Sequence, residues 1–193
     1  MKRIIHIVAF FVFISLLITG CQIGKPSRFE IRNKVTWNSS LDDVRESENN
    51  NDVKYYNDAD EKEESLSYKN ISVSNYTDAS LRYNFRDGVL VAVRYFFDDI
   101  TGDGIENIYD SLKAKYGKHV KEDIQLCLDL MKAAGYDWTV FANTDRYHNY
   151  RNWKLPDGTF IVSWSDRYTA YNIVYLNGNE LDKNLSKPNT EGL

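Results

Sequence analysis

The stretch Leu81-Arg-Tyr-Asn-Phe-Arg-Asp-Gly-Val-Leu-Val-Ala-Val-Arg-Tyr-Phe-Phe97 decides the fold class of this chain. Hydrophobic and polar residues alternate in it, and alternation with a period of two is typical of β-strands that bury one face. Asp87-Gly88 lies between the two halves and is a hairpin signal. We therefore predict an antiparallel hairpin whose strands cover residues 81–85 and 89–97.

The register of this hairpin depends on the length of its loop. A two-residue turn would place Leu81 opposite Arg94, which pairs a hydrophobic side chain with a charged one. A three-residue loop over 86–88, with Gly88 in the left-handed conformation, places Leu81 opposite Val93 and aligns the hydrophobic faces. The sequence favours the three-residue loop.

Further elements are expected on both sides of the hairpin. A short helix should follow a cap at Ser39 or Ser40, and two later helices should end at Gly117 and Gly135. The other expected elements are strands over 66–73, 137–141, 150–155, 159–164 and 171–176 and helices over 105–116 and 121–134. This order predicts an α+β domain with short helices on one face of an antiparallel sheet. Residues 36–98 and 99–178 both place helix before strands, which suggests two tandem units.

The N-terminus has the features of an export signal over residues 1–20. Met1-Lys2-Arg3 is cationic, and the hydrophobic run that follows to Ile18 is shorter than the about twenty residues of a membrane-spanning helix. Ile18-Thr-Gly-Cys21 resembles the lipobox of bacterial lipoproteins. That resemblance implies a diacylglycerol on the sulfur of Cys21 and a second acylation, such as palmitate, on its freed amine. The domain would then be anchored at the extracytoplasmic face of the cell membrane.

Composition narrows the classes of function. The net charge of −4 argues against nucleic acid as a partner, because proteins that bind it concentrate basic residues on one face. Cys127 is the thiol left after lipidation, so no internal disulfide is expected, and its position on a hydrophobic helical stripe predicts burial rather than catalysis.

The expected organisation is a flexible tether over 21–35, a folded domain over 36–178 with a polar, acid-rich loop over 46–64, and a polar tail over 179–193.

Three motifs resemble a pattern in small Gram-positive lipoproteins. They are Trp37-Asn-Ser-Ser-Leu-Asp-Asp-Val44, Tyr83-Asn-Phe-Arg-Asp-Gly-Val-Leu90 and Leu112-Lys-Ala-Lys-Tyr-Gly117. The succession of helix and hairpin is similar to the BamE/SmpA and β-lactamase-inhibitor-like folds. The resemblance implies a domain for protein–protein contact and supports the fold more than the function. The helix expected over 121–134 departs from the pattern, which has a loop there.

Residues 98–110 contain a candidate calcium loop. Counted from Asp99, oxygen-bearing side chains occupy EF-hand positions one, three, five, nine and twelve, and a glycine occupies position six. The candidate ligands are Asp99, Thr101, Asp103, Asn107 and Asp110. The sequence favours the alternative, a strand-to-helix turn in which Asp103 caps the helix and Glu106 completes a capping box. Apart from calcium, no cofactor is expected.

Aromatic residues are dense in the last third of the chain. If exposed, they would form a platform for a glycan or a protein partner, because aromatic side chains give a large contact area at low entropic cost. If buried, they are the core of the sheet. The residues expected on such a binding surface are Trp138, Tyr150, Trp153, Trp164 and Tyr168.

Two functions remain open from the sequence. The first is a lipid-anchored binding module that contacts an envelope protein or a wall polymer, because no G-x-S-x-G, H-E-x-x-H, P-loop or C-x-x-C motif occurs. The alternative is a cell-wall hydrolase, or a regulator of one, with acidic residues in a cleft, since catalytic carboxylate pairs have no fixed sequence spacing. A buried carboxylate pair in a pocket would favour the alternative.

Overall fold

The computed structural model describes residues 30–48, 53–58, 63–119, 124–136, 147–166 and 170–185. The predicted signal segment, Cys21, the predicted strand over 137–141 with Trp138, and Tyr168 lie outside these residues. Within the described residues, none of the helices combines the length and the hydrophobicity that crossing a membrane would need.

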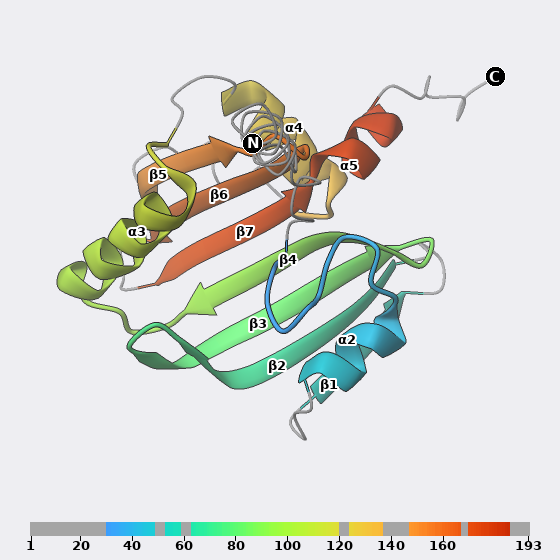
Figure 1. The fold of residues 1–193 in the computed structure, drawn as a ribbon, viewed down its shortest axis with the longest axis horizontal. Helices are drawn as coiled ribbons and strands as arrows, with labels where there is room; N and C mark the ends of the chain where they lie inside the picture. Colours follow the sequence, from blue (N-terminus) through green and yellow to red (C-terminus); the bar gives the residue numbers. More distant parts are fainter. Residues whose placement is uncertain are drawn as a thin grey trace, which may run out of the picture.

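Seven antiparallel strands form one sheet, in the order β1-β2-β3-β4-β7-β6-β5 (Figure 1). The strands are β1 (Val53–Asp58), β2 (Glu63–Val73), β3 (Tyr76–Arg86), β4 (Val89–Phe97), β5 (Tyr147–Lys154), β6 (Thr159–Asp166) and β7 (Tyr171–Asn177). Strands β1 to β4 form one meander and β5 to β7 form a second, and the two join where β4 pairs with β7. The predicted α+β class with an antiparallel sheet is therefore confirmed.

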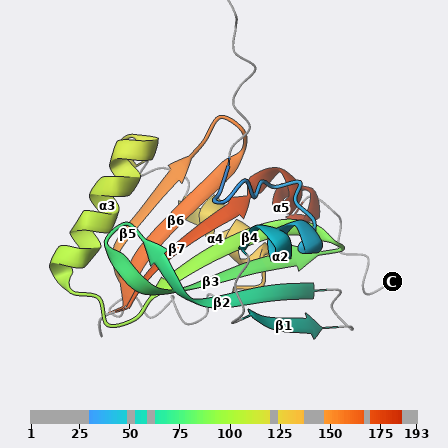
Figure 2. The same cartoon turned by 60° about the horizontal axis from the view of Figure 1, so that its bottom comes forward.

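Helices cover both faces of this sheet rather than one (Figure 2). The helices are α2 (Leu41–Glu48), α3 (Gly102–Tyr116), α4 (Ile124–Ala133) and α5 (Gly178–Leu185). Helices α2 and α3 pack on one hydrophobic core, and α4 and α5 pack on a second core across the sheet. Strand β7 shows this most clearly, because all seven of its residues are buried, with Ile173 in the first core and Val174 in the second. Its nearly continuous hydrophobic sequence is typical of a strand covered on both sides.

The β3–β4 hairpin has a two-residue turn, so the predicted three-residue loop is wrong. Asp87 and Gly88 have φ values of 50° and 75°, as in a type I′ turn. A β-bulge then shifts the register by one residue on β4, so that Leu81 lies opposite Tyr95 rather than Arg94. The bulge, rather than a three-residue loop, thus aligns the hydrophobic faces of the two strands.

The ends of the helices follow from local sequence. At the start of α2, the N–H of Asp43 donates to Ser40 Oγ (3.2 Å) and the N–H of Ser40 donates to Asp43 Oδ2 (2.8 Å), a reciprocal cap. The pKa of Asp43 is lowered by these bonds, chiefly by the backbone N–H of Ser40. Helix α3 ends at Gly117 with φ of 81°, and Gly135 follows α4 with the same φ, as predicted.

Three segments outside the predicted core are folded. Residues 30–37, called the strap here, lie against the first core with Ile31 and Val35 buried, so this part of the predicted tether is not a free linker. Strand β1 lies in the predicted acid-rich loop over 46–64, and α5 lies in the predicted tail with Leu181 fully buried. The strap and α5 lack a strong hydrophobic pattern, because only isolated side chains of them reach a core.

Candidate functional site

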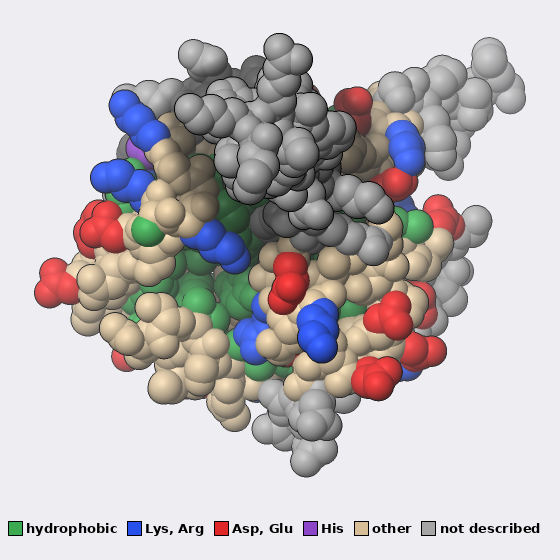
Figure 3. All heavy atoms as spheres, viewed as in Figure 1, with side chains coloured by type: hydrophobic (Ala, Val, Ile, Leu, Met, Phe, Trp, Pro, Cys, Tyr) green, Lys and Arg blue, Asp and Glu red, His purple; other side chains and the backbone are tan. Residues whose placement is uncertain are grey.

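The candidate site is a cavity on the face of the sheet that carries α4. It is lined by residues of β2, β3 and β4 and has a volume of about 210 Å³. We call it the arginine pocket, and its lining residues are Ser67, Ser80, Leu81, Arg82, Arg94 and Phe96. Even-numbered residues of β3 point to this face because the odd-numbered ones, such as Tyr83, fill the first core. Figure 3 shows the opposite face, where hydrophobic side chains gather in a hollow beside α3.

Two arginines stand directly opposite each other in this pocket. Arg82 of β3 and Arg94 of β4 are register partners, and directly opposed residues in an antiparallel pair have Cα atoms about 5 Å apart. Like charges in this position destabilise a sheet. Burial lowers the pKa of Arg94; the nearby Tyr136 partly opposes this shift, and the positive charge of Arg82 adds a smaller lowering. The pair therefore concentrates positive charge on a protein whose net charge is negative.

Neutral groups hold the Arg94 guanidinium in place. Asn172 Oδ1, on β7, accepts hydrogen bonds from Arg94 Nε at 3.0 Å and from Arg94 Nη2 at 2.7 Å. The rings of Phe96 and Tyr136 lie 5.4 Å and 5.9 Å from the guanidinium carbon. Within the described chain, no carboxylate pairs with Arg94. Two N–H groups on Nη1 and one on Nη2 remain for another acceptor, since a guanidinium carries five.

Two acids of β2 and β3 in the described part of this face are paired with another residue or lie away from the pocket. Glu63 pairs with Arg86, which also donates to the carbonyl of Ala133. Asp78 lies four residues before Arg82 on β3, and four residues of a strand extend about 13 Å. The pocket thus offers two guanidinium groups, two serine hydroxyls and one aromatic wall. This combination can bind an anion, and the described lining residues include neither a nucleophile with a base nor a metal-ligand set.

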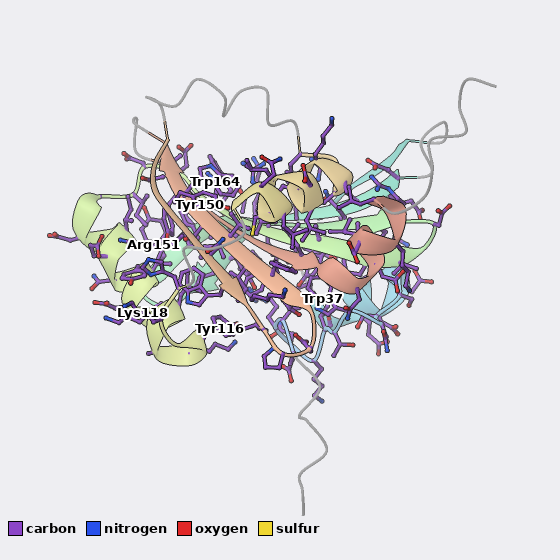
Figure 4. The ribbon with its side chains drawn as sticks, turned by 90° about the horizontal axis from the view of Figure 1, so that it is seen from above. Trp37, Tyr116, Lys118, Tyr150, Arg151 and Trp164 are labelled. Atoms are coloured by element: carbon purple, nitrogen blue, oxygen red, sulfur yellow. The ribbon has the colours of Figure 1, made fainter. Side chains whose placement is uncertain are left out.

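The predicted aromatic surface is largely core. Trp153 is 2% exposed and packs in the first core, where its indole Nε1 donates to the carbonyl of Gly117 at 2.9 Å. Trp164 is 4% exposed and packs in the second core, and Tyr150 lies partly buried beside it (Figure 4). The expectation that these tryptophans form an exposed platform is wrong, because helices on both faces bury both sides of the strands.

The candidate calcium loop is the beginning of a helix. Helix α3 begins at Gly102, and Thr101 is its cap, with Thr101 Oγ1 accepting from the N–H of Gly104 at 3.3 Å. The turn was predicted correctly, but its cap is Thr101 rather than Asp103, and Glu106 pairs with Arg151 at 3.2 Å. The described residues hold no group of three or more His, Cys, Asp or Glu side chains arranged for a metal. Of the five predicted ligands, Asp103, Asn107 and Asp110 lie within the helix and Asp99 and Thr101 precede it.

Glu48 is the one acid that is buried among the described residues. Its carboxylate accepts a hydrogen bond from the Tyr83 hydroxyl, and its Oε1 lies 3.1 Å from Arg32 Nε on the strap, as an ion pair without an aligned hydrogen bond. Burial, reinforced by the charge of Glu48, raises the pKa of Tyr83. The described part of the chain therefore has no buried pair of carboxylates of the kind that would favour a hydrolase.

Cys127 has the buried environment that the sequence predicted. Its side chain is 1% exposed on α4, and the Asn152 side-chain amide donates to its sulfur at 3.4 Å. Burial raises the pKa of the neighbouring Tyr150. The thiol is therefore a packed core group between α4 and β5.

The arginine pocket could not be predicted from the sequence. Each arginine alternates with hydrophobic residues along its strand, as a solvated polar face does. The feature that indicates a pocket is the cross-strand pairing of the two arginines, and this pairing follows only from the correct register of β3 and β4.

Fold and pocket together define a class, an α+β domain with a cationic cavity on an antiparallel sheet. Searches of protein-family models, of characterised proteins and of solved structures find no match to this chain.

Proposed function

We propose that this protein is a lipid-anchored, non-catalytic binding module of the cell envelope whose arginine pocket holds an anionic group of its partner. The partner would be an envelope protein or a wall polymer outside the cytoplasmic membrane. The observation that carries the proposal is the half-buried guanidinium of Arg94, which binds the neutral oxygen of Asn172 and lies directly opposite Arg82 in a cavity.

The energetics of the pocket support binding of an anion. A directly opposed pair of like charges costs roughly 0.2–1 kcal/mol in a sheet, and an anion bound at Arg94 weakens this repulsion. Arg94 is oriented by Asn172 and two aromatic rings before any ligand arrives. A guanidinium fixed in this way loses little further rotamer entropy when it binds a planar or tetrahedral anion.

The proposed anchor at Cys21 rests on the Ile18-Thr-Gly-Cys21 motif. Two acyl chains hold a protein stably on a membrane, where one chain does not. Confinement to the membrane surface raises the effective concentration of a partner in the same layer. A pocket of modest affinity would then suffice for function.

The binding proposal is tested by thermal unfolding of the full chain in detergent, with inorganic phosphate titrated against sodium chloride of equal ionic strength. We expect phosphate to raise the Tm saturably, because it binds the folded state. Arg94→Gln should abolish this rise. Arg45→Gln, which changes an exposed arginine paired with Asp42 on α2, should preserve it. An equal rise with chloride, or an undiminished rise in Arg94→Gln, would contradict the proposal.

The anchor is tested separately by fractionating cells that express the full chain or Cys21→Ala. The unchanged chain should sediment with membranes and leave them only with detergent. Cys21→Ala should lose the acyl chains and appear in a soluble fraction or as an unprocessed precursor. Equal membrane association and an equal apparent mass of the two proteins would exclude lipidation at this residue.

A further inference from the structure

We infer that residues 109–118, called the lysine end of α3 here, dock on anionic lipid head groups of the membrane to which the chain is anchored. This inference rests on the lipid anchor in the proposed function and adds a second, electrostatic contact with the same membrane. It follows from the lysines of this segment, from the aromatic side chains beside them and from the position of the strap.

Positive charge is concentrated at the lysine end. Lys113, Lys115 and Lys118 are exposed, and none of the ion pairs among the described residues includes them. The acids of α3 lie in its earlier turns, the last of them at Asp110. Lysines near an anionic lipid surface strengthen binding about fivefold each, which corresponds to about 1 kcal/mol. The three lysines together would therefore strengthen binding roughly a hundredfold.

Aromatic rings lie beside two of these lysines. The Nζ atom of Lys115 is 5.1 Å from the ring centroid of Tyr116, and that of Lys113 is 6.0 Å from the ring centroid of Tyr109. Both tyrosines are partly buried and pack against the first core, on the face where hydrophobic side chains gather in a hollow (Figure 3). Tyrosine is suited to the membrane interface, because its ring is apolar and its hydroxyl is polar. The lysine end thus combines the two kinds of side chain that the head-group region binds.

The lysine end lies on the face of the sheet that carries the strap. The strap packs on the first core, as Tyr116 does, and Figure 4 shows Tyr116, Lys118 and Trp37 of the strap on the same side of the sheet. Glu30, where the strap begins, follows Cys21 by nine residues, which can reach at most about 30 Å. A domain anchored through so short a segment would keep this face close to the lipid.

Helix α2 lies on the same face and limits the contact to the side of α3. Asp42, Asp43 and Glu46 of α2 are exposed, and an anionic membrane repels them. We therefore expect the domain to tilt, with the lysine end against the head groups and α2 farther from them.

The test places the full chain, purified from membranes, in lipid nanodiscs that contain a gadolinium-labelled lipid, and measures the paramagnetic relaxation of backbone amide protons. In discs of equal parts phosphatidylglycerol and phosphatidylcholine, residues 113–118 should relax faster than residues 124–133 of α4, because they lie closer to the labelled head groups. The difference should shrink in pure phosphatidylcholine. It should also shrink in 1 M sodium chloride, where the screening length is about 3 Å. Equal differences in the two kinds of disc would overturn the inference.

Two matched variants test the lysines. The variant Lys115→Gln, Lys118→Gln should lower the ratio of docked to undocked protein roughly 25-fold in the anionic discs. The control variant Lys132→Gln, Lys183→Gln removes the same charge from exposed positions on α4 and α5 and should preserve the relaxation difference. Circular dichroism at the temperature of the measurement verifies that each variant is folded. An undiminished difference in the first variant would overturn the inference.

The outcomes separate the inference from the anchor on which it rests. A chain that leaves the phosphatidylcholine discs without detergent has no anchor, and the inference fails with it. A chain that stays on both kinds of disc with equal relaxation keeps the anchor and overturns the docking. If polyphosphate then shifts the resonances of Lys115 and Lys118, the lysine end binds a soluble polyanion instead of the membrane.

Discussion

Arg94 illustrates at the scale of one residue how neutral groups can hold a half-buried charge, since none of the described acids pairs with it. The Asn172 amide oxygen and two aromatic rings satisfy part of the guanidinium, and its remaining donors belong to the pocket. Arginine is suited to this role because its planar group stacks on rings and donates in a fixed fork. A lysine could not make the same set of contacts, so Arg94→Lys should lose anion binding although it keeps the charge.

We expect the opposed arginines to lower the stability of the folded protein while they favour binding of an anion. In buffer of low ionic strength without phosphate, Arg82→Gln should raise the free energy of unfolding by about 0.2–1 kcal/mol, because it removes a like-charge cross-strand pair. The gain should vanish in 1 M sodium chloride, where the screening length is about 3 Å. Chemical denaturation at the two salt concentrations measures both values. A loss of stability at low salt would contradict this prediction, since it would show that the other interactions of Arg82 outweigh its repulsion from Arg94.

We expect the buried charge of Glu48 to contribute strongly to the free energy of unfolding. Its side chain is 1% exposed and pairs with Arg32, whose side chain is 24% exposed. Glu48→Ala should lower the free energy of unfolding by about 3 kcal/mol, because it leaves Arg32 and the Tyr83 hydroxyl without their partner. Asp42→Ala is the control, since Asp42 is 88% exposed in its ion pair and should change stability by less than about 1 kcal/mol. Similar losses in both variants, measured by urea denaturation, would contradict this account.

At the scale of elements, the β3–β4 hairpin determines whether the site exists. The two-residue turn with its bulge makes Arg82 the partner of Arg94. The three-residue loop predicted from the sequence would instead have placed Arg82 opposite Ala92. One residue of register therefore separates a cationic pocket from an ordinary polar strand face.

The turn itself is tested by a pair of glycines. Gly88 has φ of 75° and open space around it, so Gly88→Ala should cost about 1–2 kcal/mol through backbone conformation alone. Gly102, at the first position of α3, also has open space but no left-handed φ. Gly102→Ala should therefore be neutral or stabilise by up to about 1 kcal/mol. Equal effects of the two substitutions on the unfolding free energy would refute the type I′ turn.

The strongly patterned elements could be predicted from sequence, and the weakly patterned ones could not. Strands β2 to β4 and β5 to β7 and helices α3 and α4 have clear periodicity, and their glycine ends follow from helix stereochemistry. The strap and α5 could not be predicted because the burial of Ile31, Val35 and Leu181 depends on surfaces that form only after the sheet assembles. The pocket was missed because a bulge has no local sequence signal here.

For the whole molecule, the junction of two meanders explains why the tryptophans are buried in the two cores and why the arginine pocket lies on the first meander. Helices cover both faces of the sheet, and so Trp153 and Trp164 serve the two cores rather than a binding platform. The arginine pocket lies on the first meander, at β2, β3 and β4. A rigid sheet therefore holds the cationic groups, which suits a site that must be organised before its ligand arrives.

The central claim, that the arginine pocket binds an anion, is tested most directly by nuclear magnetic resonance of the arginine side chains. The full chain would be labelled with ¹⁵N-arginine in detergent micelles and titrated with inorganic phosphate at constant ionic strength. The Nε–H resonances of Arg82 and Arg94 should shift together and saturate at one common Kd, while that of Arg45 on α2 stays in place. A shift of all arginine resonances in parallel without saturation, or no shift at Arg94, would contradict the claim.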